Sequence, residues 1–490
     1  MTNHLRTHLG KGLVAALLTV NVAFAQTTVQ APAATRYSLR QCIDVALQNN
    51  LTIKQGQLDV QGADLQLRQA KFNRYPSVTG FANQNLSSGR TINPFSNSFV
   101  TRSISSNNYQ LSANATLFNG FALQNTIKQN DLFLQSSEQS LRATQNNVAL
   151  TVVQNYLNVL TNTEQLDIAR RQVETSRTQV DRTQRLVNAG TLPEANLYDI
   201  RAQLANDELA VVNALNNVDL AKLALLQTMN VSGLGNTSTF DVERFDLPDP
   251  TLEPYSASVQ QIYEIAQQNM PEVRAAELRV KSDALGVNVA KAALMPVLSL
   301  SGAVNTLYSS VGAQKQFENG TERVGQTIFI QGIPQEVFIE QPTFRYEDYG
   351  YGEQLRNNLN RSVSLNLQIP IFNRLQGRNR ITSATITQKT SEIAADNVRL
   401  TLRQNIEQAY TNMVAANNRF KATQVQVQSL ELAFRAAESR LNAGAINTVD
   451  YNIAKNNLDR ARANLVQAKY DYIFRTKILD FYQNKPLSFQ

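Results

Sequence analysis

The chain has 490 residues, of which 17% are charged, and a net charge of +7 at pH 7. That charge is mild for this length, and no dense Lys/Arg block is present, so we expect no nucleic-acid partner. The only histidines are His4 and His8, and the only cysteine is Cys42. Without them there is no catalytic triad, Cys/His metal cluster or internal disulfide, and we expect neither an enzyme nor a cofactor.

Residues 1–25 have the pattern of a secretory signal peptide, which would remove both histidines. Arg6 and Lys11 precede a short apolar run that ends in Ala-Phe-Ala before Gln26. No later stretch reaches the roughly 18 apolar residues of a membrane-spanning helix. If the mature chain crosses a membrane, it must therefore use strands.

The mature chain is an internal duplication. The segment "CIDVALQNNLTIKQGQLDV" from Cys42 aligns with "IYEIAQQNMPEVRAAELRV" from Ile262. Later in the halves, Phe118-Asn119 aligns with Phe372-Asn373, with an insertion between about Ser301 and Arg361. We expect a first repeat over 26–230, a linker over 231–257 and a second repeat over 258–490. Because Cys42 aligns with an isoleucine, we interpret it as a core residue.

In each half the first helix is followed by two segments of alternating hydrophobicity. The earlier strand starts at Pro76 or Pro296; "PVLSLSGAV" alternates well, whereas "PSVTGFANQ" alternates poorly. In the later strand, apolar residues at every second position face one side: Tyr109, Leu111, Ala113, Ala115 and Leu117, matched by Val363, Leu365, Leu367, Ile369 and Ile371. This is the length and pattern of an outer-membrane strand, although a half-buried hairpin of a soluble domain has the same pattern.

Four strands cannot close a barrel, and an open sheet edge cannot face lipid. If the strands span a membrane, several copies of the chain must therefore pool them. The segments at about Gln84–Asn108 and Asn305–Arg361 then become surface loops, which suits their polar and aromatic composition.

The next elements are two long helices, from about Leu123 to Asn188 and from about Arg378 to Asn442, without Pro or Gly. Apolar residues recur every seven positions: Val152, Val159, Leu166, Val173, Val180 and Val187, matched by Ile406, Met413, Phe420, Val427, Phe434 and Leu441. This period predicts coiled-coil packing. Three residues after successive positions stand Asn155, Asn162, Ala169 and Ser176. Such a narrow stripe fits a helix packed on two sides in a larger barrel; an extended periplasmic helical hairpin is the alternative.

Each long helix ends in the same turn, "NAGTLPEANLYD" from Asn188 or "NAGAINTVDYNI" from Asn442. Gly190 and Gly444 occupy the position at which a helix end needs a left-handed residue. A second, shorter helix with the same seven-residue period follows each turn. The chain therefore has two helical hairpin tips.

In this order and in duplicate, these elements resemble the TolC family of outer-membrane efflux channels. The resemblance covers nearly the whole mature chain. It implies a mainly α fold with a membrane β-barrel portion: a homotrimer with a 12-stranded β-barrel in the lipid of a Gram-negative outer membrane, continued by a periplasmic α-helical coiled-coil barrel. A periplasmic adaptor and an inner-membrane transporter of the RND or ABC type would dock at the tips. The linker would contribute to a belt around the helices.

The resemblance also implies functional residues at the tips. Asp450 matches an acidic residue that rings the periplasmic constriction of the family, whereas Ile453 and Ile446 replace a second acid and a basic residue. An equally good interpretation of Asp450 is an acid stabilised by a helix N-terminus. Gly190, Leu192, Gly444 and Ile446 are candidates for adaptor contact.

The predicted function is the passive exit duct of a tripartite efflux pump. A type I protein secretion channel would use the same fold, and the sequence does not separate the two. A periplasmic coiled-coil adaptor or structural protein is the alternative of a different class. It predicts no membrane strands, and the alternating segments after Pro76 and Pro296 argue against it.

Overall fold

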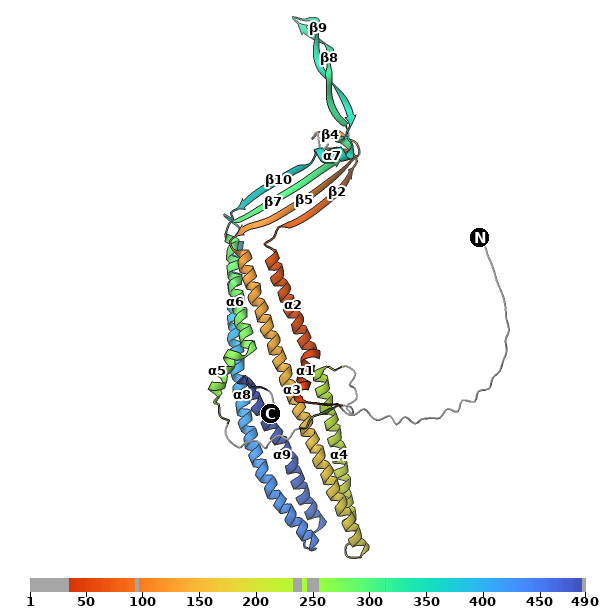
Figure 1. Ribbon diagram of the computed structural model, residues 1–490, viewed down its shortest axis with the longest axis vertical. Helices are drawn as coiled ribbons and strands as arrows, with labels where there is room; N and C mark the ends of the chain where they lie inside the picture. The colour runs from red at the N-terminus through yellow and green to blue at the C-terminus, as the bar shows by residue number, and fades with distance from the viewer. Residues whose placement is uncertain (1–34, 93–96, 232–239, 245–254, 313, 487–490) are drawn as a thin grey trace, which may run out of the picture.

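The computed structural model describes residues 35–92, 97–231, 240–244, 255–312 and 314–486. The predicted signal peptide and most of the predicted linker lie outside these ranges. A four-stranded sheet lies at one end of a long layer of helices, and both helical tips lie at the other end (Figure 1).

The helices of the two halves recur in the same order. The first half contains α1 (Leu39–Asn49), α2 (Leu51–Phe72), α3 (Ala122–Asn188) and α4 (Glu194–Met229). The second half contains α5 (Val259–Asn269), α6 (Pro271–Lys291), α8 (Gln376–Asn442) and α9 (Thr448–Tyr482), together with the short α7 (Tyr351–Asn357). Each bound of α3 is matched in α8 at the offset that the aligned tips predicted, which confirms the duplicated order of elements.

Both first helices begin with the same cap and stop at the same place. Ser38 and Ser258 each accept a hydrogen bond from the backbone of a glutamine three residues later, whose side chain bonds back to the serine. Asn50 then adopts an extended conformation that ends α1 and caps α2. The alignment from Cys42 did not predict this break, because the apolar periodicity continues across it.

The seven-residue period predicted for the long helices is confirmed. Val152 through Val187 lie in one helix, α3, and both long helices have 67 residues. The first positions of the period are buried and the last are half-buried towards the tip. Ala169 and Ser176 at the companion positions are also buried, whereas Asn155 and Asn162 are half-buried.

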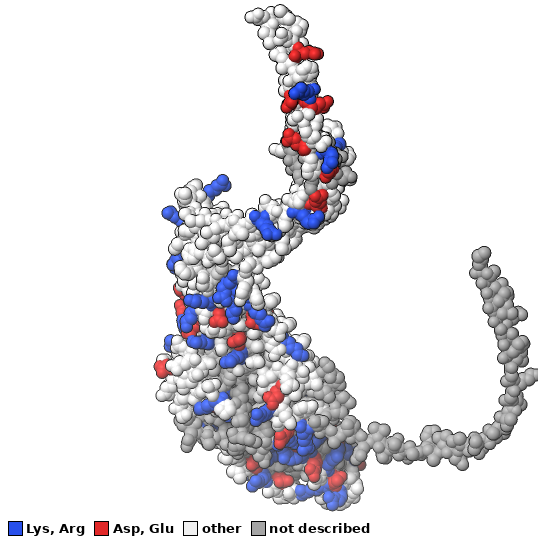
Figure 2. Space-filling model, turned by 45° about the horizontal axis from the view of Figure 1, so that its top comes forward, with Lys and Arg blue, Asp and Glu red and all other residues white. Residues whose placement is uncertain are grey.

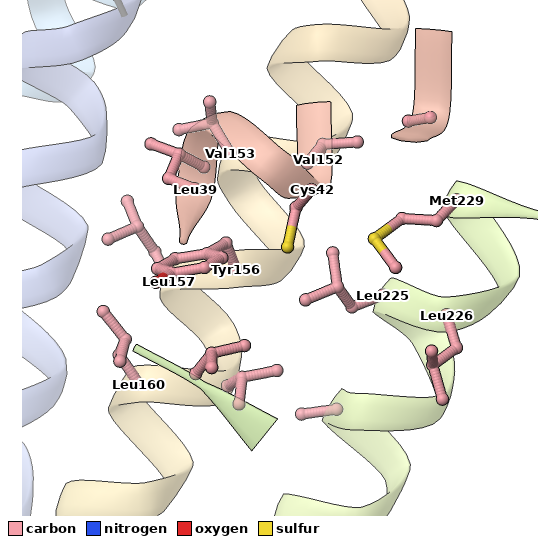
Figure 3. Packing of buried hydrophobic residues seen from close by; sticks show 14 of the residues in the cluster. Leu39, Cys42, Val152, Val153, Tyr156, Leu157, Leu160, Leu225, Leu226 and Met229 are labelled. Atoms are coloured by element: carbon pink, nitrogen blue, oxygen red, sulfur yellow. The ribbon is translucent and has the colours of Figure 1, made fainter. Parts of the chain in front are cut away.

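The largest core of the first half joins α1, α3 and α4 (Figure 3). Cys42 lies in this core with no exposed surface, beside Tyr156 and Leu225 (Figure 3). Burial raises the pKa of the Cys42 thiol to about 12. The prediction that Cys42 is a core residue is therefore confirmed.

The described part of the linker contributes Phe240 and Val242 to this core. Strand β6 (Phe240–Val242) pairs in parallel with β1 (Thr35–Tyr37), and Phe240 is buried. Arg244 donates to Asp167 of α3 at 2.8 Å.

The sheet is antiparallel in the order β10 (Asn360–Gln368), β7 (Val297–Ser309), β5 (Ile104–Asn119), β2 (Ser77–Ser87). The four predicted strands are thus confirmed, including the poorly alternating one after Pro76. Strand β10 ends before Pro370, whereas alternation to Ile371 was expected; proline has no N–H to donate to a ladder.

The two segments expected to be loops are partly strands. The first contains β3 (Arg90–Ile92) and β4 (Phe99–Thr101), and the inserted one contains a long hairpin of β8 (Gln314–Ile330) and β9 (Ile333–Asp348). Composition alone was misleading here, because "RVGQTIFIQGIPQEVFIE" alternates around a Gln-Gly turn. The location of both segments at the end opposite the tips is confirmed (Figure 1).

Helix α4 is more apolar than the sequence analysis expected of any helix after the signal peptide. It contains an 18-residue window with a mean hydropathy of 1.4, enough by length and composition to cross a membrane, which the sequence analysis did not predict. Only 22% of the window is buried, and Leu209, Val212 and Leu215 are exposed on it.

Candidate functional site

The sheet has one apolar face and one polar face. The pairing aligns Leu365 with Leu300 and Ala115, and aligns Val304 with Leu111. Residues at these positions alternate with Ser299, Ser301, Asn305, Ser112 and Asn114, which face the other side. The register therefore aligns the apolar residues of β10, β7 and β5 on one face of the sheet and their polar residues on the other face.

The apolar face has the properties of a lipid-facing surface. Val363 is 80% exposed and Leu365 is 63% exposed. Strands β2, β5 and β7 contain no charged residue, and β10 has only Arg361 near its end. In Figure 2 this band of the molecule is almost free of the charged side chains that cover the helices. A sheet of this kind fits a bilayer on one side and water on the other.

The two tips are built alike. Gly190 and Gly444 have φ angles of +72° and +71°, in the left-handed region that favours glycine. The backbone N–H groups of Thr191 and Ala445, one residue further on, bond back to carbonyls of α3 and α8 at 3.0 and 2.8 Å. The predicted role of both glycines in ending the helices is confirmed.

The candidate site residues lie on these tips. Asp450 is exposed in the first turn of α9, where its N–H donates to the side chain of Asn447 at 2.8 Å. Asp450 therefore lies where a helix N-terminus stabilises an acid. The same exposed position is compatible with a constriction residue, so the geometry of one chain does not separate the two interpretations. Leu192 and Ile446 are half-exposed, and both glycines are exposed.

A buried ion cluster above the tips joins the two hairpins. The ammonium group of Lys455 in α9 donates to Asp207 of α4 and to Asp459, at 2.9 Å each. The side chains of Lys455 and Asp207 are 4% and 8% exposed, and Ser176 of α3 also donates to Asp207.

Sequence reasoning missed this cluster. Lys455 lies four residues after Tyr451 and three before Leu458, so it shares the buried face of α9 with them. A charged residue on an apolar face is a signal that it has a partner. The sequence does not name the partner, since Asp207 lies 248 residues away.

Apolar stripes remain uncovered along both edges of the helical layer. On α2 the stripe is Leu51, Leu58, Leu65 and Phe72, and on α8 it includes Ile386, Ile393 and Leu400, all more than half exposed. Within each stripe the residues lie seven apart. Helices α2 and α8 are separated by α3 and α6, because α2 packs on α3, α3 on α6 and α6 on α8.

The described residues contain no group of three or more His, Cys, Asp or Glu side chains that could hold a metal ion. Three surfaces of the described chain remain as candidate functional sites: the sheet with its apolar and polar faces, the two helical tips, and the uncovered apolar stripes on α2 and α8.

Comparison with known proteins identifies a family. A family profile described as "Outer membrane efflux protein" matches residues 42–231 and 262–476, one segment in each half of the chain. The outer membrane efflux protein BepC of Brucella suis is 22% identical over 468 residues, with 93% of this chain and 87% of BepC covered. The outer membrane protein TolC of Vibrio cholerae is 23% identical, with 69% of this chain and 68% of TolC covered.

The fold is that of solved outer-membrane proteins. The outer membrane protein VceC of Vibrio cholerae superposes with a TM-score of 0.70 at 14% identity, covering 92% of this chain and 97% of VceC. At this level of identity the similarity is evidence for the fold and not for a substrate.

Proposed function

Because the chain belongs to the outer membrane efflux protein family, whose profile matches one segment in each half of it, we propose that it is the exit duct of a tripartite efflux pump. It resides in the outer membrane and extends into the periplasm. It conducts substrates passively and catalyses no reaction. The observation that carries this proposal is the register of the sheet, which gives a single chain one apolar and one polar surface.

The duct is a homotrimer. One chain supplies a four-stranded sheet in which the outer edges of β10 and β2 have no partner strand among the described residues. Three copies give about 12 strands, enough for a closed barrel with a polar interior. Helix α2 leads into the edge strand β2, and the edge strand β10 precedes α8, so the uncovered stripes on these helices lie along the same two edges (Figure 1). Pairing β2 with β10 of the next copy therefore also brings one stripe against the other.

The periplasmic part is the helical barrel formed by the same contacts. The exposed apolar residues of α4 continue the α2 edge towards the tips and would be covered there. The high hydropathy of α4 thus reflects an interface between copies. The linker strand β6 pairs with β1 and packs on α3, and we assign the linker to a belt around the helices.

The tips are the docking end. They carry the half-exposed Leu192 and Ile446 at turns fixed by Gly190 and Gly444. We assign these four residues to contact with a periplasmic adaptor, through which an inner-membrane transporter of the RND or ABC type delivers substrate.

Asp450 is the constriction residue of this proposal. Three symmetry-related carboxylates near one axis repel each other, and they attract cations into the pore. The acid is exposed and makes no ion pair among the described contacts, so its charge is available to the pore.

The test is single-channel conductance of the mature protein in a planar bilayer. We expect discrete steps, with lower cation selectivity and larger conductance after Asp450→Ala. Glu194→Ala is the matched control, because Glu194 occupies the first turn of α4 at the other tip; it should leave both quantities unchanged. Equal effects of the two substitutions would contradict the constriction, and protein that forms trimers in the membrane but no steps under any condition would contradict the duct.

A further inference from the structure

The β8–β9 hairpin is a free-standing ribbon. It projects beyond the end of the sheet that lies opposite the tips (Figure 1). Its strands pair with each other and with no strand of the four-stranded sheet. Gln331 and Gly332 connect them with φ angles of +50° and +81°, as a two-residue type I′ turn requires. The register of the outer part of the hairpin is therefore well defined.

That register separates the outer hairpin into two faces. Val324 pairs with Ile339, Gln326 with Val337, Ile328 with Gln335, and Ile330 with Ile333. We call this side the β-branched face; its six apolar members are Val324, Ile328, Ile330, Ile333, Val337 and Ile339. Each of the six is between 37% and 65% exposed.

The opposite face carries the charges. Arg323 donates from Nε to Glu340 at 3.4 Å, and Thr327 pairs with Glu336. Phe338 on this side lies against Gly325 of the partner strand. This face carries Arg323, Glu336 and Glu340, and also Phe329 and Phe338, which are 72% and 64% exposed. The β-branched face differs in that it has no charged residue between Val324 and Ile339.

The β-branched face needs a cover. A two-stranded hairpin alone in water is marginally stable at best. Burying one Val or Ile side chain contributes about 1.5–3 kcal/mol. No other described helix or strand packs extensively on the hairpin, so the described residues of one chain leave this face without a cover.

The proposed assembly supplies such a cover. This step rests on the homotrimer of the proposed function, in which each copy carries one hairpin at the same end of the barrel. About 12 strands spaced about 4.8 Å apart and tilted by about 40° make a barrel about 24 Å across. A strand of this hairpin is about 50 Å long at about 3.3 Å per residue. Each hairpin can therefore reach the three-fold axis and the two other hairpins.

We propose that the hairpins of three copies pack against one another through their β-branched faces and form a cap over the outer mouth of the duct. The occupant of each β-branched face is thus another copy of this chain. The charged faces, with Arg323 and Glu340, point outward to water. The cap restricts entry of large external solutes while flexing at its base to let substrates leave.

Disulfide cross-linking tests the proposal, with neighbouring residues as a matched pair. Ile328→Cys places a thiol on the β-branched face, and Thr327→Cys places one on the charged face. The native Cys42 is fully buried and serves as a silent background. After mild oxidation of whole cells, we expect Ile328→Cys to give a disulfide-linked dimer of the chain and Thr327→Cys to give none.

Two further readouts separate the possible outcomes. The molar mass of each variant in detergent reports the trimer: monomers would contradict the proposed function, whereas trimers without the Ile328→Cys link would overturn only the cap. A water-soluble maleimide should label Thr327→Cys much faster than Ile328→Cys. Equal labelling, equal cross-linking of both variants, or an Ile328→Cys adduct with a different protein would each overturn the cap.

A pair of lysine substitutions tests the consequence of the cap. Ile328→Lys places three charges between the packed faces, whereas Thr327→Lys adds the same charge on the outer face. We expect Ile328→Lys to increase uptake of a large hydrophilic antibiotic and Thr327→Lys to leave it unchanged. Equal uptake by the two trimeric variants would overturn the gating role of the cap.

Discussion

Lys455 shows how one residue can join the two halves of the chain. Its ammonium group pairs with two carboxylates, the buried Asp207 on the first hairpin and the half-buried Asp459 on its own helix. Removing one partner of a buried ion pair is costly because the remaining charges stay desolvated. The cluster therefore couples the packing of α9 to that of α4.

Lys455→Met should destabilise the helical region by about 3–5 kcal/mol, because it leaves the buried Asp207 and the half-buried Asp459 without a counter-ion. Arg177→Met is the control: Arg177 and Glu208 also pair between α3 and α4 at 2.9 Å, but their side chains are 65% and 48% exposed. Loss of that pair should cost about 1 kcal/mol or less. The thermal loss of helical circular dichroism measures both, and similar midpoints for the two variants would contradict the structural role of Lys455.

At the residue scale the sequence predicted the positions that local rules determine. Gly190 and Gly444 were identified because a left-handed helix end has a preferred residue, and Cys42 because its repeat partner is apolar. The Lys455 cluster was not identified, since it depends on which helix faces α9. That choice is made by packing between segments 248 residues apart.

The strand-to-helix junctions show the same principle at the scale of elements. Gly120 and Phe121 both have a φ of +64° between β5 and α3. Their repeat partners, Arg374 and Leu375, have φ angles of +52° and +63° before α8. Two consecutive left-handed residues thus turn the chain from sheet to helix in both halves, although only the first half uses glycine.

Gly120→Ala should destabilise the junction by about 2–4 kcal/mol. About 1 kcal/mol comes from a side chain in the left-handed region, and the rest from overpacking, because the new Cβ would lie 2.5 Å from Cβ of Met295. Gly352→Ala on α7 is the matched control, with nothing within 4 Å of its Cβ. We expect Gly120→Ala to reduce the amount of trimer in the outer membrane, measured by quantitative immunoblotting; equal amounts for both alanine variants would disprove the steric argument.

Long elements were predictable where a period continued without interruption. The 67-residue helices follow from seven-residue spacing without Pro or Gly. The break at Asn50 was not predictable from that spacing, because it depends on a cap whose side chain also donates to Thr228 of α4 at 3.2 Å. The β8–β9 hairpin was not predicted for a different reason. Its polar composition is typical of a loop, although its residues alternate as in a strand.

At the scale of the whole molecule, a single chain exposes surfaces that are normally buried between the subunits of an oligomer. Its sheet has two open edges, and its helical layer has an uncovered apolar stripe along each side. Because the two stripes differ, the contact that covers them is heterologous, and such contacts close into a ring when the rotation between copies is right. The sequence predicted the need for several copies from the strand count, but it did not predict which helices meet.

Leu65→Glu on α2 and Ile393→Glu on α8 should each prevent assembly, since Leu65 and Ile393 are 67% and 71% exposed in one chain and would be buried between copies. Each substitution loses about 2 kcal/mol of apolar burial and places a carboxylate in all three interfaces at once. Gln66→Glu is the control, because it adds the same charge one residue away, on the exposed side of the same helix. Light scattering in mild detergent should give trimers for the control and smaller species for the other two variants. If Leu65→Glu remained trimeric while Ile393→Glu did not, the α8 stripe would have to pack against a surface other than α2, and the proposed ring contact would be wrong.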